Sequence, residues 1–152
     1  MEQLGAQAKA VIASNRYMTL GTADESGLPW VTPVWFASED HREFFWVSRP
    51  EARHSRNLAV RPQLSIVIFD SQVPVGSAKA VYMSAVAEQA TDADLDRGIA
   101  IFSGRSEAQG LRPWRQEDVS PSAHLRLYRA DVSEHFVLGP GDRRLPFSPV
   151  SD

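Results

Sequence analysis

The apolar positions near the start of the chain repeat with the period of a helix. Leu4, Ala8, Val11 and Ile12 are separated by about one helical turn or lie next to each other, so they fall on one stripe of an α-helix. The pattern predicts a short amphipathic helix from about Glu2 to Ser14. We expect its apolar stripe to pack against the rest of the domain.

Beyond this helix, apolar residues alternate with polar ones or form short runs bounded by turn residues, which is typical of β-strands. The first two runs are joined by a turn in which Gly27 can take a positive φ, so they are expected to form a hairpin. The last run is long and predicts either one bent strand or a pair of strands. Strands are expected at residues 17–23, 28–37, 43–48, 64–69, 78–88 and 124–138.

Pro33 stands in the middle of the second predicted strand. Proline has no backbone N–H and cannot donate to a neighbouring strand, so it is confined to edges and bulges of sheets. This strand is therefore expected to lie at an edge or to be interrupted. The irregularity also leaves backbone groups there free for other partners.

Two further helices are expected between the strands. One begins near Pro50, which suits a first turn, and continues to Val60. The other follows residues 91–94, a capping box with Asp in place of Glu. Residues 104–122 are interpreted as loop-rich, and the tail of residues 139–152 is expected to wrap irregularly around a single domain.

This order of elements contains hairpins rather than repeated βαβ crossovers. Hairpins with few helices are typical of an antiparallel sheet that closes into a barrel, with helices covering its ends. The length of 152 residues is that of one domain. We therefore predict a mainly β domain spanning residues 1–152.

Composition and charge exclude several classes of protein. Apolar residues make up 43% and charged residues 23%, which fits neither a disordered polyelectrolyte nor a membrane-embedded chain. The net charge of −3 disfavours general binding to nucleic acid. The chain has no cysteine, which excludes thiol chemistry and disulfides. No signal peptide is recognisable, so a cytoplasmic location is expected.

Common catalytic and nucleotide-binding motifs are absent from the sequence. The four histidines occur singly, with no pair at the spacing of a zinc site on a helix or strand, and no metal site is predicted. The chain contains no Gly-x-Ser-x-Gly elbow, no phosphate loop and no Gly-x-Gly-x-x-Gly motif.

Positive charge is concentrated around the helix predicted after Pro50. Residues 49–61 contain four arginines and one glutamate in a chain that is acidic overall. Arg53 and His54 fall in the first turn, where side-chain donors, free backbone N–H groups and the helix dipole can converge on an anion such as a phosphate monoester. The alternative interpretation is an ordinary solvated helix face.

Four segments of the chain resemble the FMN-binding split-barrel superfamily, the group around pyridoxamine 5′-phosphate oxidase and the flavin/deazaflavin oxidoreductases. They are GLPWVTPVWF at 27–36, FWVS at 45–48, ARHSRNL at 52–58 and LSIV at 64–67. The resemblance implies a six-stranded antiparallel split β-barrel that forms a homodimer, with two flavin sites at the interface between subunits.

The resemblance also implies roles for particular residues. The ring of the flavin would lie along the second strand, the ribityl chain beside the third, and the 5′-phosphate at the start of the following helix, with one further cation from Lys79 and with Arg56 nearby. The residues implied as cofactor contacts are Thr32, Pro33, Val34, Trp35, Val47, Ser48, Arg53, His54, Asn57 and Lys79. The chain has Ala-Arg-His where Ser-Arg-Lys is the commoner pattern. One permanent charge is therefore missing, and phosphate binding is expected to depend on pH.

The four tryptophans each have two interpretations, as partners of a flavin or as packing residues. Packing is favoured for Trp46. Trp114, in a loop between Pro113 and Arg115, is expected either to cover the flavin of a partner subunit or to anchor its own loop.

We expect an FMN-dependent oxidoreductase that transfers a hydride between flavin N5 and a small organic substrate, because in flavin enzymes the cofactor carries the redox chemistry. No catalytic side chain is identified. Two alternatives stay open. One is a deazaflavin-dependent reductase on the same fold, and the other is a dimeric flavin- or haem-binding protein without turnover.

Overall fold

The hairpin predicted at the start of the sheet determines how the barrel begins. Gly27 has φ +89°, which a left-handed turn residue requires and which glycine adopts without strain. The Asp24 side chain accepts hydrogen bonds from the backbone N–H groups of Ser26 and Leu28, which stabilises the turn. This turn joins β1 (Tyr17–Ala23) to β2 (Pro29–Trp35), which pair along their whole length.

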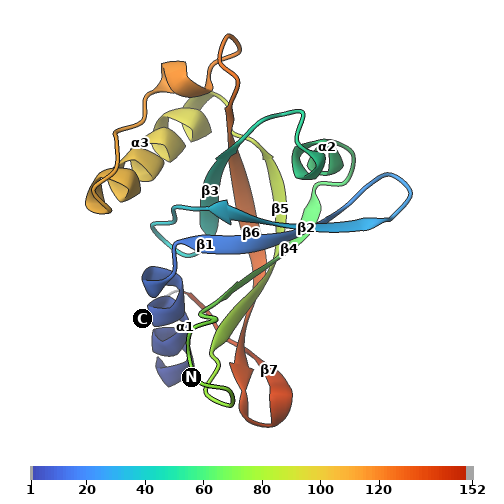
Figure 1. The fold of residues 1–152 in the computed structure, drawn as a ribbon, viewed down its shortest axis with the longest axis vertical. Helices are drawn as coiled ribbons and strands as arrows, with labels where there is room; N and C mark the ends of the chain where they lie inside the picture. Colours follow the sequence, from blue (N-terminus) through green and yellow to red (C-terminus); the bar gives the residue numbers. More distant parts are fainter. Residues whose placement is uncertain (1, 150–152) are drawn as a thin grey trace.

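The computed structural model describes residues 2–149, and its elements are drawn in Figure 1. The helices are α1 (Glu2–Ser14), α2 (Arg53–Val60) and α3 (Asp92–Ala108), with short 3-10 helices η1 (Gln116–Val119) and η2 (Pro140–Asp142). The remaining strands are β3 (Glu43–Ser48), β4 (Gln63–Phe69), β5 (Ala80–Gln89), β6 (Arg126–Gly139) and β7 (Arg143–Pro146).

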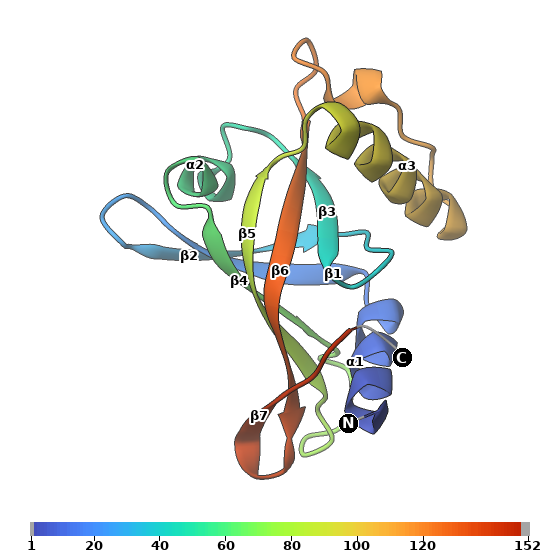
Figure 2. The same ribbon diagram turned by 180° about the vertical axis from the view of Figure 1, so that it is seen from behind.

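The strands form one antiparallel sheet in the order β2-β1-β4-β5-β6-β3. β7 pairs with the C-terminal end of β6, from Phe136 to Gly139. A bridge between Ala37 and Phe45 brings the two ends of this path together. The sheet therefore curls into the predicted split barrel, seen from both sides in Figures 1 and 2. Because β2 is an end strand of the path, the edge position expected from Pro33 is confirmed.

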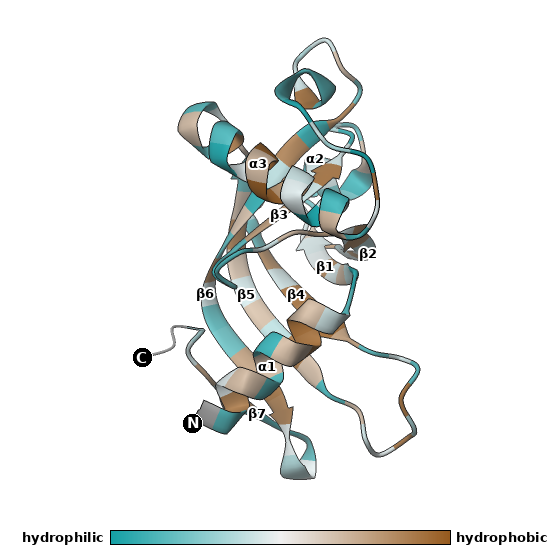
Figure 3. Cartoon of the chain, turned by 90° about the vertical axis from the view of Figure 1, so that its left-hand side faces the viewer, coloured by the Kyte–Doolittle hydropathy of each residue, from teal (hydrophilic) through white to brown (hydrophobic). Residues whose placement is uncertain are grey.

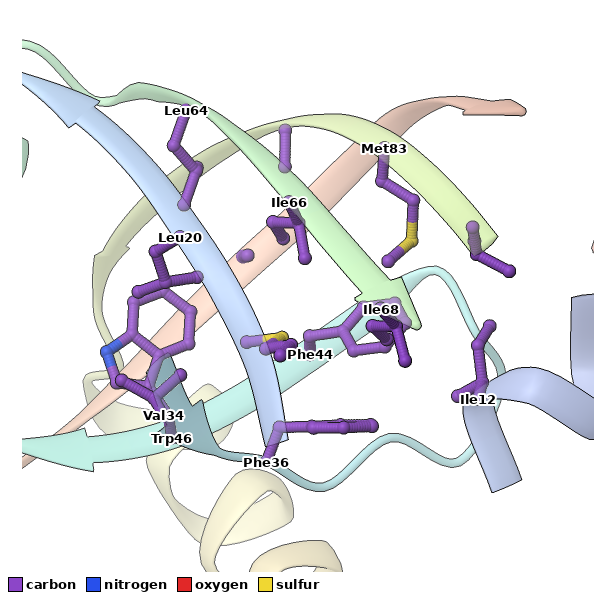
Figure 4. Packing of buried hydrophobic residues seen from close by; sticks show 14 of the residues in the cluster. Ile12, Leu20, Val34, Phe36, Phe44, Trp46, Leu64, Ile66, Ile68 and Met83 are labelled. Atoms are coloured by element: carbon purple, nitrogen blue, oxygen red, sulfur yellow. The ribbon is translucent and has the colours of Figure 1, made fainter. Parts of the chain in front are cut away.

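The barrel encloses the main hydrophobic core. Every strand except β7 contributes buried side chains, and Figure 4 shows them converging between the strands. Trp46 is fully buried and stacks on Tyr128, with ring centroids 5.7 Å apart and planes 11° apart. The packing role favoured for Trp46 is confirmed. Ile12 closes one end of this core from α1, as the amphipathic pattern of that helix predicted.

A second, smaller core lies between the outside of the barrel and α3. Phe102 of α3 contacts Trp35 and Trp114 edge to face, with centroids 4.8 and 5.2 Å away. Trp114 therefore anchors its loop within its own chain. Seen from the side in Figure 3, α3 and α1 cover the same side of the strands at different heights.

Three expectations about local structure were wrong. Thr91 precedes α3, but its side chain makes no capping hydrogen bond, so the predicted capping box does not form. The region interpreted as loop from residue 104 is still helix up to Ala108. The tail interpreted as irregular forms η2 and β7, because β7 finds hydrogen-bond partners on β6 that its own sequence does not indicate. No helix within residues 2–149 is long and apolar enough to cross a lipid bilayer.

Close contact between α3 and the barrel depends on Gly98. A Cβ atom at this position would lie 2.6 Å from a ring carbon of Phe45 and 2.9 Å from a methyl group of Leu127. Because both neighbours are fully buried, Gly98→Ala is expected to lower the free energy of unfolding by about 1–3 kcal/mol, measured by urea denaturation. Gly104→Ala in the same helix is the control. A Cβ atom at position 104 would have no neighbouring atom within 4 Å, so this substitution is expected to leave the free energy of unfolding unchanged or to raise it. Equal effects at the two positions would contradict the prediction.

Candidate functional site

The start of α2 has free hydrogen-bond donors. Ala52, in extended conformation before the helix, forms no side-chain capping bond, so the first backbone N–H groups are left without a cap. These N–H groups and the helix dipole favour an anion at this position. The helix begins at Arg53, three residues later than Pro50 suggested, and this makes Arg53 and His54 its first two residues.

Arg53 lies against the neighbouring edge strand. Its guanidinium carbon is 4.2 Å from the centroid of the Trp30 ring, a cation–π contact that holds the charge beside β2. The Trp30 side chain is 40% exposed. Within residues 2–149 Arg53 forms no salt bridge, although its charge interacts through space with the Asp24 carboxylate of the hairpin turn. An external anion can therefore still pair with the guanidinium. Sequence reasoning considered Trp30 as a flavin partner and missed this contact, which joins residues far apart in the chain.

His54 points to the end of β3. Its Nε2 atom and the hydroxyl of the buried Ser48 share a hydrogen bond of 2.8 Å. Burial lowers the pKa of His54 from its ordinary value of 6.5, so the imidazole is neutral at pH 7. The helix start therefore carries one permanent positive side chain, Arg53, and one group that becomes charged only in acid.

Asn57 and Arg61 fix the position of α2. The buried Asn57 amide donates to Thr22 Oγ1 of β1 at 3.1 Å, and Arg61 donates to the carbonyl oxygens of Asp24 and Glu25 in the hairpin turn. These contacts hold the helix across the end of the barrel. Asn57 was predicted as a cofactor contact, but its amide is 4% exposed and engaged with β1, so its observed role is to position the helix.

The residues predicted along the flavin ring have different surroundings. Thr32 is half-buried and Pro33 is exposed, so these two are accessible on β2. Val34 is only 8% exposed and belongs to the barrel core. The Trp35 indole N–H donates to Gln109 Oε1 at 2.9 Å in the contact with α3. The side chains of Val34 and Trp35 are therefore committed to packing, and only their backbone is left for a ligand.

The two residues predicted beside the ribityl chain end the third strand. Val47 packs against the small core under α3, and Ser48 holds His54. Ser48 thus lies within hydrogen-bonding distance of a residue at the helix start, and the implied contact of Val47 and Ser48 with a ribityl chain stays a prediction.

Lys79 is not brought to this site within one chain. In the pairing of β4 with β5, Gln63 is opposite Val86 and Phe69 is opposite Ala80. Lys79 directly precedes Ala80 and therefore lies near the Phe69 end of β4. The helix α2 ends at Val60 and therefore lies near the Gln63 end of the same strand. Six residues of strand separate these ends by about 20 Å. A contribution of Lys79 to a phosphate held by Arg53 therefore requires a second subunit.

The family model for pyridoxamine 5′-phosphate oxidase matches residues 4–133, which is most of the chain. The chain belongs to this family. A member from Burkholderia thailandensis, pyridoxine/pyridoxamine 5′-phosphate oxidase, is 25% identical over 126 residues, covering 81% of this chain and 56% of that enzyme. The chain thus spans little more than half the length of this relative.

Solved structures share the split-barrel fold of this pyridoxamine 5′-phosphate oxidase family member. A haem-binding protein from Mycobacterium smegmatis superimposes with a TM-score of 0.75 at 20% identity, covering 95% of this chain and 57% of that one. HutZ, the haem storage protein from Vibrio cholerae, superimposes with a TM-score of 0.66 at 26% identity, covering 85% and 90%.

Proposed function

We propose that this chain binds FMN and acts as an FMN-dependent oxidoreductase on a small organic substrate. The observation that carries the proposal is the uncapped start of α2, where Arg53 forms no salt bridge within residues 2–149 and lies beside the edge strand β2. Membership of the pyridoxamine 5′-phosphate oxidase family supports the same placement. When bound, the flavin supplies hydride transfer at N5.

The residues present fit a phosphorylated flavin. The free N–H groups at the start of α2 and the Arg53 guanidinium would hold the 5′-phosphate. The Ser48 hydroxyl would border the ribityl chain, and the exposed edge of β2 at Thr32 and Pro33 would meet the ring. None of these groups is a strong acid or base at neutral pH, so the protein's own contribution would be to bind and orient.

The experiment that tests this proposal is identification of the molecule that copurifies with the protein. A yellow preparation that releases FMN on denaturation supports it. A preparation that is colourless and quenches the fluorescence of added deazaflavin favours the deazaflavin alternative instead. Protein that retains neither compound would overturn it.

A non-catalytic haem-binding role is the second candidate. It is favoured by the two solved structures described above, whose proteins bind or store haem. On this role, haem added to the purified protein would show a Soret band that differs from that of free haem. Bound haem would also compete with FMN if both use the same surface. Reduction of bound flavin by NAD(P)H followed by fast reoxidation with a small acceptor would favour the enzyme.

We further propose that two copies pair through the outer face of the sheet. Val31, 67% exposed, borders a hollow of about 290 Å³ on this face, together with Thr19, Gly21 and Ser65. Such a surface resembles a dimer interface more than a solvated face. Sedimentation equilibrium is expected to give twice the 16.9 kDa of one chain, and Val31→Glu is expected to shift the mass toward the monomer. A monomeric wild-type protein would contradict this pairing.

Flavin affinity should depend on the protonation of His54. Burial lowers the pKa of His54 below its ordinary value of 6.5, so the imidazole is mainly neutral near pH 7 and gains positive charge as the pH falls below 6.5. FMN is therefore expected to bind more tightly to the wild type at pH 6 than to a His54→Phe variant, with the difference shrinking at pH 8. Fluorescence titration measures both. His54→Lys is expected to bind FMN at pH 8 more tightly than the wild type does. Identical pH profiles for wild type and His54→Phe would contradict the role of His54.

A further inference from the structure

A second hollow lies on the other flank of α2 from Arg53. Its volume of about 570 Å³ falls within the range of small-molecule sites, roughly 300–1,000 Å³. Figures 1 and 2 both show α2 beside the end of β5, which forms the opposite wall. The residues that matter to the argument are Pro50, Ser55, Arg56, Ala59, Glu88 and Tyr128.

One wall of the hollow contains a buried hydroxyl without a partner. Ser55 is 3% exposed, lines the hollow, and its Oγ atom forms no hydrogen bond. Among the described residues the only other buried side-chain polar atom in this state is Nε1 of Trp46, whose ring stacks on Tyr128 of the same hollow. An unpartnered buried hydroxyl costs about 1–3 kcal/mol, and such groups mark positions where a water or ligand atom is bound.

The rim of the hollow carries two unpaired charges of opposite sign. Arg56 and Glu88 are both exposed, and neither forms a salt bridge within residues 2–149. The rest of the lining is largely apolar and includes Pro50, Ala59 and Tyr128. A flat apolar body can occupy such walls, while the two charges remain available to a zwitterionic group.

We propose that this hollow binds a small aromatic zwitterion, of the chemical class of an aromatic amino acid. The aromatic ring packs on the apolar lining, which includes Pro50 and Tyr128, the carboxylate pairs with Arg56, and the ammonium group pairs with Glu88. Ser55 supplies a hydrogen bond at the inner wall. The site does not depend on the flavin proposal, because Arg53 faces Trp30 on β2 and contributes nothing to this lining.

The test uses flavin-free full-length protein and L-phenylalanine as the probe, followed by ¹H–¹⁵N correlation spectra. Shifts are expected to cluster at residues 50–59 and 86–89. Phenethylamine lacks the carboxylate and 3-phenylpropionate lacks the ammonium group. Each is expected to bind about two- to fivefold more weakly, the range for one partly exposed ion pair.

Variants identify the site. Ala59 is exposed on the helix and lines the hollow, so Ala59→Trp fills it without disturbing the core. This variant is expected to weaken phenylalanine binding at least about tenfold. Arg56→Gln is expected to abolish the preference for phenylalanine over phenethylamine, and Glu88→Gln the preference over 3-phenylpropionate.

Unchanged binding in Ala59→Trp, or shifts scattered over the molecule, would overturn the proposal, as would equal binding of all three probes. FMN retention by Ala59→Trp is measured alongside. Loss of phenylalanine binding with FMN retention intact supports this site separately from the flavin site. Absence of FMN binding in every variant would count against the flavin proposal alone.

Discussion

Trp46→Ala is expected to lower the free energy of unfolding by about 3–5 kcal/mol, the range for truncating a large buried aromatic side chain. Trp46 is fully buried in the barrel core and stacks on Tyr128. Its removal leaves a cavity that the surrounding strands cannot close, because they are held by the hydrogen bonds of the barrel. Urea denaturation followed by circular dichroism measures the change.

Trp46→Phe is the matched control for this prediction. Phenylalanine keeps an aromatic face against Tyr128 and also removes the indole N–H, which has no hydrogen-bond partner. The smaller substitution is therefore expected to cost distinctly less than Trp46→Ala. Equal destabilisation of the two variants would contradict the assignment of the stability to side-chain volume and stacking.

Arg53→Ala is expected to weaken FMN binding by about 1.5–3 kcal/mol, the worth of a hydrogen bond to a charged group. This corresponds to roughly 10- to 150-fold in Kd. The reason is that Arg53 is the permanent cation at the uncapped start of α2 and forms no salt bridge among residues 2–149. Equilibrium dialysis or flavin fluorescence measures the affinity.

Two controls separate phosphate binding from other effects of Arg53. Arg56→Ala removes a charge one turn further along the same helix, outside its uncapped first turn, and is expected to weaken FMN binding less than Arg53→Ala. Riboflavin lacks the phosphate, so its affinity is expected to be similar in wild type and Arg53→Ala. Unchanged FMN affinity in Arg53→Ala would remove the proposed phosphate site, and an equal loss for riboflavin would assign the effect to Trp30 and the shape of the site.

Local pattern predicted most of the elements. β1, β3 and α1 begin and end where the alternation or helical period indicated. Pro33 is on an edge strand, as expected because proline has no backbone N–H to donate to a second neighbouring strand. The exceptions depend on distant partners. β7 is a strand because β6 offers it hydrogen bonds. Beyond Gly104, α3 is held by polar contacts, in which Arg105 donates to the carbonyl oxygen of Ala13 and Ser106 to that of Arg112.

The candidate site was predicted only in part, for the same reason. Residue types in the first turn of a helix point to an anion site from sequence, and Arg53 and His54 are there. The environment of each side chain is not encoded locally. His54 is bonded to Ser48, Asn57 is turned to Thr22, and Lys79 is at the far end of β4. Each of these outcomes follows from how strands and helix are packed.

The sequence by itself indicated the family, through the four segments that resemble it. It also indicated the antiparallel barrel and the cationic helix start, because periodicity, proline and charge act within a few residues of where they occur. Tertiary structure alone decided which of the implied cofactor residues remain free to bind. Packing places Val34 in the core and Trp35 against α3, while Arg53 forms no salt bridge within the described chain. The physical reason is that burial and hydrogen bonding depend on residues distant in sequence, which only the closed barrel brings together.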